Sequence, residues 1–287
     1  MQGETVLLEA VDAYRATLGD RLLAAYALGS LAHGGFSELV SDVDLGLIIS
    51  DPLQPSDPDT IVRVLKAERD KGSPLHERLS VFCGTPATLA GDREGGRFPP
   101  LDRLDLLESG RLVAGTDDAR DRVQRPGKEE LVIAGSEFAL DHLAAVEPSA
   151  GGGDDRLGSI NADGSEAFEQ IRSPELLASQ GVRQVTKLVL FPARFLYTAA
   201  TGHVGTNGDA VAHYLDRHQK PSARLVEAAM AWRTDPPSDR AAVVELLRAE
   251  LVPLYLEYID DHARRLQGMG REDLAAAFGE WRKQLLA

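Results

Sequence analysis

The stretch ALGSLAHGGFSELVSDVDL, residues 27–45, decides how the first half of this chain is interpreted. An apolar run, Leu22–Leu28, predicts a strand that stops at Gly29, and a second apolar run begins at Leu45. Asp42 and Asp44 stand just before and at the start of that second strand. Because side chains alternate between the two faces of a strand, residues two apart point to the same face. Both carboxylates can therefore meet at one site.

The same stretch carries groups suited to phosphate and metal binding. Carboxylates held this close repel one another, so the pair indicates a hard cation such as Mg²⁺ between them. Gly29 lets the backbone approach a phosphate, and the Ser30 hydroxyl and nearby N–H groups can donate to its oxygens. Ser41 adds another hydroxyl. Gly-Ser alone is usually only a turn, and Asp-Val-Asp is often solvated. In this order and spacing they predict a phosphoryl-transfer site.

Composition limits the kinds of partner. The chain has 287 residues, with 31 Lys and Arg against 45 Asp and Glu, which gives a formal net charge of −14. This balance argues against duplex nucleic acid and favours a cationic small molecule, although it is equally explained by solubility. No apolar stretch approaches the roughly 20 residues that span a bilayer. We expect a cytoplasmic monomer or weak dimer with no membrane partner, in which the lone Cys83 fills apolar space.

The pattern of strands and helices predicts an α+β chain with two domains. Residues 1–125 are expected to form a small mixed sheet flanked by helices, and residues 126–287 a helical bundle. The expected strands are Leu22–Leu28, Leu45–Ile49, Leu79–Cys83 and Leu112–Gly115. The expected helices are Val6–Leu18, Thr60–Lys71, Leu101–Glu108, Lys128–Val146, Ser173–Ser179, Val182–Ala200, Gly208–Arg217, Ser222–Arg233, Asp239–Gln267 and Arg271–Leu286. Residues 148–164 are rich in glycine and aspartate and are expected to form a loop between helices.

Two segments resemble a known family. Residues 27–30 together with 41–45 resemble the signature of the nucleotidyltransferase superfamily, which includes DNA polymerase beta and the antibiotic adenylyltransferases. Residues 186–202, which contain Arg194 and end in Ala-Thr-Gly, are similar to the helical C-terminal domain of streptomycin and spectinomycin adenylyltransferases. The resemblance covers roughly half of the chain. It implies a nucleotidyltransferase catalytic domain followed by a helical domain that clamps nucleotide and substrate.

The resemblance also implies roles for particular residues. Asp42 and Asp44 would hold Mg²⁺, as two ions, with ATP or another nucleoside triphosphate as co-substrate. A third carboxylate, acting as metal ligand or general base, lies in the family on the strand after the intervening helix. Here that strand is Leu79–Cys83, which contains no acidic residue. We therefore assign the role to Glu77, two residues before the strand, with Asp102 and Asp105 as alternatives.

Cations on the predicted helix Val182–Ala200 would bind the triphosphate. Arg183, Lys187 and Arg194 recur at intervals of four and seven residues, which places them on one face. The resemblance implies that Arg194 contacts ATP phosphates. It also implies a phosphate-binding lysine shortly after the Ala-Thr-Gly segment, where this chain has Asn207. Lys187 would compensate from the same helix, but ion pairing explains Lys187 and Arg183 equally well.

Three functions are compatible with these residues. The first is transfer of a nucleoside monophosphate, AMP from ATP, to a hydroxyl of a small cationic acceptor such as an aminoglycoside. The second is nucleotidyl transfer to a protein or RNA, against which the acidic balance weighs where the acceptor is RNA. The third is a nucleotide-binding regulatory module without catalysis, for which the missing strand carboxylate and Asn207 argue.

Overall fold

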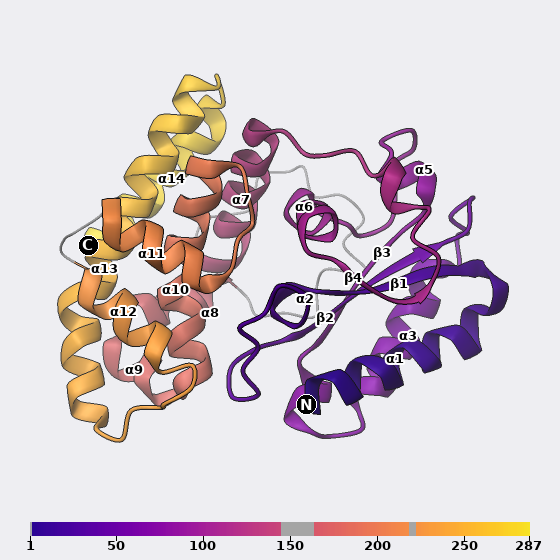
Figure 1. The fold of residues 1–287 in the computed structure, drawn as a ribbon. Helices are drawn as coiled ribbons and strands as arrows, with labels where there is room; N and C mark the ends of the chain where they lie inside the picture. The colour runs from indigo at the N-terminus through magenta and orange to yellow at the C-terminus, as the bar shows by residue number, and fades with distance from the viewer. Residues whose placement is uncertain (1, 145–163, 218–221) are drawn as a thin grey trace. The chain divides into compact units, whose positions relative to one another are not determined.

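The computed structural model describes residues 2–144, 164–217 and 222–287. The chain forms two compact units, which we call the first and the second unit, and the division falls between Pro126 and Gly127 (Figure 1). The α+β class predicted from the sequence is confirmed: the first unit contains a four-stranded sheet with helices, and the described part of the second unit contains helices only.

The first unit alternates helices with strands. Its helices are α1 (Gln2–Leu18), α2 (Gly29–His33), α3 (Asp57–Arg69), α4 (Pro74–Glu77), α5 (Pro86–Leu89) and α6 (Pro100–Glu108), with short 3₁₀ turns η1 (Gly19–Arg21) and η2 (Arg120–Arg122). Its strands are β1 (Leu22–Leu28), β2 (Val43–Ile49), β3 (Leu79–Gly84) and β4 (Arg111–Gly115).

The sheet has the order β3-β2-β1-β4 and is mixed. Strand β1 is antiparallel to both β2 and β4, while β3 runs parallel to β2. This register places Asp44 opposite Leu28 on β1 and opposite Ser80 on β3. The end of β1 and the start of β2 therefore meet at one edge of the sheet, which is where the glycine turn and the aspartates lie.

Both faces of the sheet are covered. On one face, α1 and α3 pack their apolar sides against alternate residues of the central strands, so that Tyr14, Val43 and Leu45 belong to one core cluster. On the other face, Leu106 of α6 joins a second core with Tyr26 and Phe82. Because α6 is held by this core, its polar side chains occupy defined positions near the sheet.

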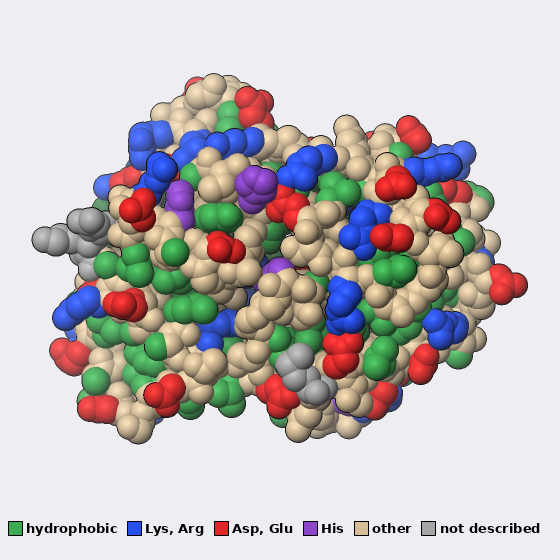
Figure 2. Space-filling view, viewed as in Figure 1, with side chains coloured by type: hydrophobic (Ala, Val, Ile, Leu, Met, Phe, Trp, Pro, Cys, Tyr) green, Lys and Arg blue, Asp and Glu red, His purple; other side chains and the backbone are tan. Residues whose placement is uncertain are grey.

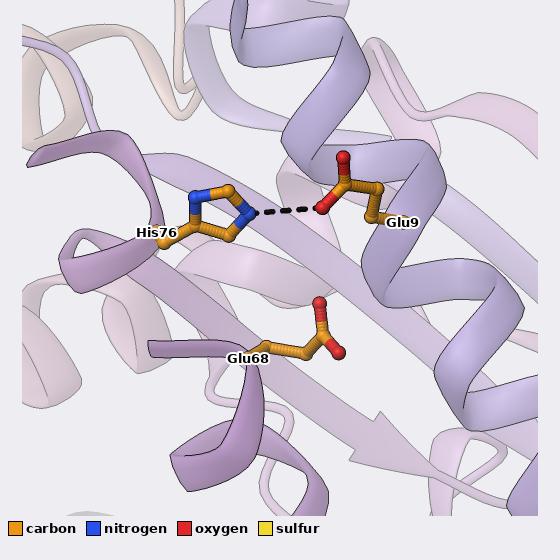
Figure 3. A group of neighbouring side chains, drawn as sticks. All are labelled: Glu9, Glu68 and His76. Carbon is orange, nitrogen blue, oxygen red and sulfur yellow. Dashed lines mark hydrogen bonds and ion pairs between the residues drawn. The ribbon is translucent and has the colours of Figure 1, made fainter. Parts of the chain in front are cut away.

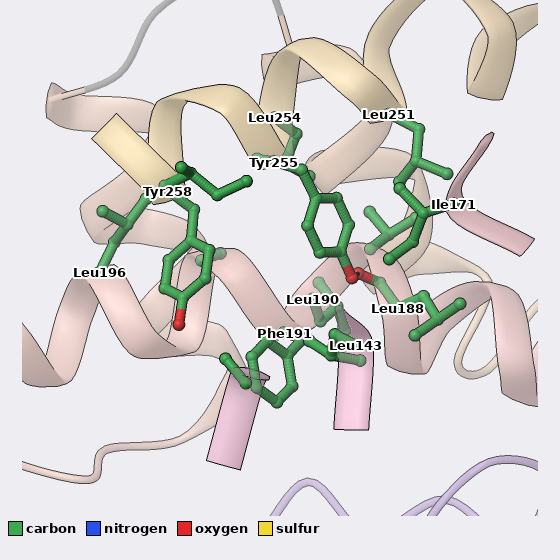
Figure 4. Close-up of a cluster of buried hydrophobic side chains, with 14 of the residues drawn as sticks. Leu143, Ile171, Leu188, Leu190, Phe191, Leu196, Leu251, Leu254, Tyr255 and Tyr258 are labelled. Atoms are coloured by element: carbon green, nitrogen blue, oxygen red, sulfur yellow. Dashed lines mark hydrogen bonds between the residues drawn. The ribbon is translucent and has the colours of Figure 1, made fainter. Parts of the chain in front are cut away.

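The second unit is built around a long amphipathic helix. Its helices are α7 (Lys128–Leu143), α8 (Gly164–Arg172), α9 (Pro174–Ser179), α10 (Val182–Thr201), α11 (Asn207–Arg217), α12 (Ala223–Ala231), α13 (Arg240–Gly268) and α14 (Glu272–Leu286). Helix α10 packs against α7, α11, α12 and α13. Figure 4 shows the core between α10 and α13, where the fully buried Tyr255 donates its hydroxyl hydrogen to the Leu188 carbonyl at 2.9 Å.

Several elements differ from the sequence prediction. Helix α8 was not predicted, and Gly164, its first residue, is the last residue of the stretch expected to be a loop. The rest of that stretch, residues 148–163, lies outside the described residues. The one-turn helices α4 and α5 were also missed. Ser73 and Thr85 cap them from residues that precede a proline, a pattern that is easily taken for a plain turn.

Two surface properties bear on the expected partners. Among the described helices, none is both long and apolar enough to cross a membrane. Figure 2 shows acidic and basic side chains interspersed over the visible face of the molecule. On this face the acidic side chains do not gather in a single patch.

Candidate active site

Gly29 forms the turn between β1 and the short helix α2. Its φ is +57°, a region that residues with a side chain rarely adopt. A Cβ atom at this position would lie only 2.4 Å from Oδ2 of Asp44. The chain therefore requires glycine here for two reasons, and the Asp44 carboxylate rests against the backbone of the turn.

Asp42 and Asp44 are both partly exposed at the start of β2. Asp42 directly precedes the strand, and Asp44 is its second residue, so alternation directs both side chains to the same face. This face also carries Ser80, which pairs with Asp44 across the parallel strands. The donor set at this edge consists of oxygens, and a bulkier residue at Gly29 would fill the space beside it. Hard divalent cations prefer such a set, so these residues fit Mg²⁺.

A partly exposed arginine, Arg69, contributes to the electrostatics of this edge. Arg69 donates from Nε and Nη2 to the carbonyl of Leu79, at 2.9 and 2.6 Å. Burial, and then the charge of Arg97, lower the pKa of Arg69, while the charge of Asp42 acts in the opposite direction. The charges of Asp42 and Arg69 therefore attract one another across this edge.

Asp105 reaches the glycine turn from helix α6. Its side chain is 6% exposed, and Oδ2 accepts the Gly29 N–H at 2.6 Å. The first amide of the turn is thus bonded to a carboxylate, which leaves Ser30, a partly exposed residue, as the next group in the turn able to donate to a phosphate. Asp105 was named from the sequence only as an alternative, and nothing in the local pattern indicated this contact.

The other residues predicted for the first unit lie as follows. Glu77 is the exposed last residue of α4, and β3 begins two residues later at Leu79. Ser41 is buried, and its Oγ accepts the Ser37 N–H at 3.0 Å. Its hydroxyl therefore shapes the loop that leads into Asp42.

The predicted phosphate-binding cations lie in the second unit. Lys187 and Arg194 are exposed on α10. Sequence analysis missed Arg233, which follows α12 and is 8% exposed. Burial, and then the charge of Arg194, lower the pKa of Arg233, so the two positive charges interact. No pattern in the sequence pairs them, because they come from different helices.

A different cluster has the spacing of metal ligands. Glu9 on α1, Glu68 on α3 and His76 on α4 bring their ligand atoms within 4.8 Å of one another (Figure 3). However, the ammonium group of Lys71 lies 3.0 Å from a Glu9 oxygen and 2.6 Å from a Glu68 oxygen. A cation is therefore already present between these carboxylates, and the cluster is an ion-pair network that joins three helices.

The first unit thus combines a four-stranded mixed sheet with a glycine turn after β1 and two aspartates at the start of β2. The fold of the chain is similar to that of a solved structure, the spectinomycin adenyltransferase AAD(9) from Enterococcus faecialis, determined with ATP and spectinomycin. It matches with a TM-score of 0.54 and 12% identity, over 85% of this chain and 99% of that one. The predicted resemblance to antibiotic adenylyltransferases is thus confirmed at the level of fold. No family model matches the sequence, and the search of curated proteins found no similar sequence.

Proposed function

We propose that this protein is a Mg²⁺-dependent nucleotidyltransferase that transfers AMP from ATP to a hydroxyl of a cationic small molecule of the aminoglycoside class. The observation that carries the proposal is the contact of Asp44 with the Gly29 turn, with Asp42 on the same strand face. The similarity to a structure that contains ATP and spectinomycin supports the choice of nucleotide and acceptor. The net charge of −14 would attract a polycation.

In the proposed reaction, a hydroxyl oxygen of the acceptor attacks the α-phosphorus of ATP in line with the leaving group. The new bond joins that oxygen to phosphorus, the bond to the β-phosphate oxygen breaks, pyrophosphate leaves, and the hydroxyl proton passes to a base. When bound, Mg²⁺ neutralises charge on the phosphates. Asp42 and Asp44 would hold it, while Gly29 and Ser30 would lie along the phosphates and Ser41 would support the loop. Positioning supplies most of the rate in such reactions.

The two units would have different roles in the reaction. Residues 1–125 would form the catalytic domain, and residues 126–287 would clamp nucleotide and substrate. Lys187 and Arg194 are exposed cations suited to a triphosphate. Arg233, whose charge interacts with that of Arg194, would add a third positive charge to this group. The assignment of Glu77 as the third carboxylate, which acts as metal ligand or general base, stays a prediction.

The test is pyrophosphate release by the purified protein with ATP and Mg²⁺ across a panel of aminoglycosides and aminocyclitols. We expect release with at least one acceptor, and loss of at least about 100-fold in kcat for Asp42→Asn and Asp44→Asn. Asp59→Asn, an exposed carboxylate on α3, is the matched control and should keep wild-type activity. If no small acceptor stimulates pyrophosphate release and radioactive ATP labels a protein or RNA band, the result would instead support a macromolecular acceptor.

A further inference from the structure

Two carboxylates contact the same glycine from two elements. Asp105 accepts the Gly29 N–H at 2.6 Å, and Oδ2 of Asp44 lies where the missing Cβ of Gly29 would be. The amide nitrogen of Gly29 and the position of its missing Cβ are each one bond from the same Cα, so they lie close together. The Asp44 and Asp105 oxygens are thus within about 8 Å of one another. The backbone of one residue, Gly29, separates them.

Asp105 is held rigidly. Its neighbours in sequence, Leu104 and Leu106, are both fully buried at 0% exposure, and Leu106 belongs to the core beneath the sheet. The Asp105 carboxylate is itself 6% exposed, and burial of a carboxylate costs free energy unless it is hydrogen-bonded. The charge-assisted bond from the main-chain amide to Oδ2 offsets part of this cost and also fixes the position of the donor. Helix α6 therefore determines where Gly29 lies.

We infer that Asp105 is a positioning residue, which holds the Gly29 turn against Asp44 and so sets the geometry of the metal-binding carboxylates. It acts through its hydrogen bond with the Gly29 amide. The inference rests on the proposed function, because it concerns the metal site at Asp42 and Asp44. Residues that orient metal ligands in this way typically change metal affinity by about 10- to 100-fold when they are removed.

Two other roles for Asp105 make different predictions. As a metal ligand it would require its negative charge, so that Asp105→Asn would be as damaging as Asp105→Ala. As a competitor that occupies an amide needed by phosphate, its removal would tighten nucleotide binding. A positioning residue needs only an acceptor for the Gly29 N–H. The asparagine side-chain oxygen supplies such an acceptor, whereas alanine does not.

The experiment measures Mn²⁺ binding by electron paramagnetic resonance in the presence of α,β-methylene-ATP, which cannot undergo transfer. We expect about 10- to 100-fold weaker Mn²⁺ binding for Asp105→Ala and near wild-type binding for Asp105→Asn. Asp59→Asn serves again as the matched control. Thermal unfolding of each variant verifies that it is folded, and the asparagine variant keeps the test valid if the alanine variant does not fold.

Wild-type Mn²⁺ affinity in folded Asp105→Ala overturns the inference, and so does equal weakening in both variants or tighter nucleotide binding in either. These outcomes are distinct from failure of the proposed function. If the wild-type protein binds no Mn²⁺ with the nucleotide, or if Asp44→Asn binds it normally, the metal site itself is wrong. If the wild type binds and Asp44→Asn does not, only the role of Asp105 is under test.

Discussion

At the scale of single residues, Gly29 combines a positive φ with close approach of a carboxylate. We predict that Gly29→Ala lowers stability by about 1–3 kcal/mol through backbone strain and also displaces Asp44, because its Cβ would lie 2.4 Å from Oδ2. Gly34→Ala is the matched control, since Gly34 has a φ of +92° but nothing within 4 Å of its Cβ position. Both variants should lose stability, measured by thermal unfolding, but only Gly29→Ala should lose Mn²⁺ binding. Equal Mn²⁺ affinity in the two would contradict the contact with Asp44.

The assignment of Glu77 can be tested at the same scale. As metal ligand or general base it would make Glu77→Gln slower by about 100-fold or more in kcat, because base catalysis contributes that much. Stability should be unchanged, since the side chain is exposed at the end of α4. The measurement is the steady-state rate of pyrophosphate release with an active acceptor. A rate equal to that of the wild type would remove Glu77 from the site.

At the scale of elements, an ion pair joins the start of α3 to the turn before β1. Asp57 is 3% exposed and accepts two hydrogen bonds from the Arg21 guanidinium, at 2.6 and 2.9 Å, and one from the Gln54 amide at 2.7 Å. Burial opposes ionisation of Asp57, but these bonds outweigh it and the pKa of the carboxyl group is lowered. The pair therefore stabilises the ionised, folded form.

We predict that Asp57→Asn destabilises the protein by about 2 kcal/mol, because the amide cannot satisfy both guanidinium donors. Asp59→Asn, two residues along the same helix and exposed, should change the free energy of unfolding by no more than about 0.5 kcal/mol. Urea unfolding followed by far-ultraviolet circular dichroism measures both. Equal effects of the two substitutions would show that the bonds to Arg21 and Gln54 contribute nothing to stability.

Most elements were predictable because their signals are local. The run Leu22–Leu28 contains no charged residue and is followed by a glycine. It forms β1 with the same bounds. The amphipathic periodicity of residues 182–200 likewise gave α10. Helices α4 and α5 were missed because a single turn has no periodicity to read, and their caps depend on side-chain bonds of Ser73 and Thr85.

At the scale of the whole molecule, pH should affect the second unit through His262. This side chain is 1% exposed between Tyr258 and Phe278. Burial lowers the pKa of His262 to about 4, with Asp261 acting in the opposite direction and Arg265 in the same one. The folded protein therefore keeps His262 neutral at pH values where the unfolded chain, with a pKa near 6.5, binds a proton.

The shifted pKa of His262 makes the free energy of unfolding depend on pH in a defined direction. Stability from the neutral histidine is complete above about pH 6.5 and is lost as the pH falls toward 4, by up to about 3 kcal/mol. Both tryptophans lie in the second unit, and Trp281 contacts Phe278, so unfolding followed by tryptophan fluorescence reports on this region. His262→Phe should flatten the dependence between pH 4 and 6.5, whereas substitution of the exposed His203 by Gln should not. An unchanged slope in His262→Phe would exclude His262 as the cause.

The sequence by itself determined the α+β class, the order of strands and helices, and the Gly29 and Asp42–Asp44 motif, because these depend on neighbours in the chain. Only the tertiary structure decided that Asp105 bonds to Gly29, that Ser80 pairs with Asp44, and that the charges of Arg233 and Arg194 interact. The physical reason is distance along the chain. Gly29 and Asp105 are 76 residues apart, and only the packing of α6 on the sheet brings them into hydrogen-bonding contact.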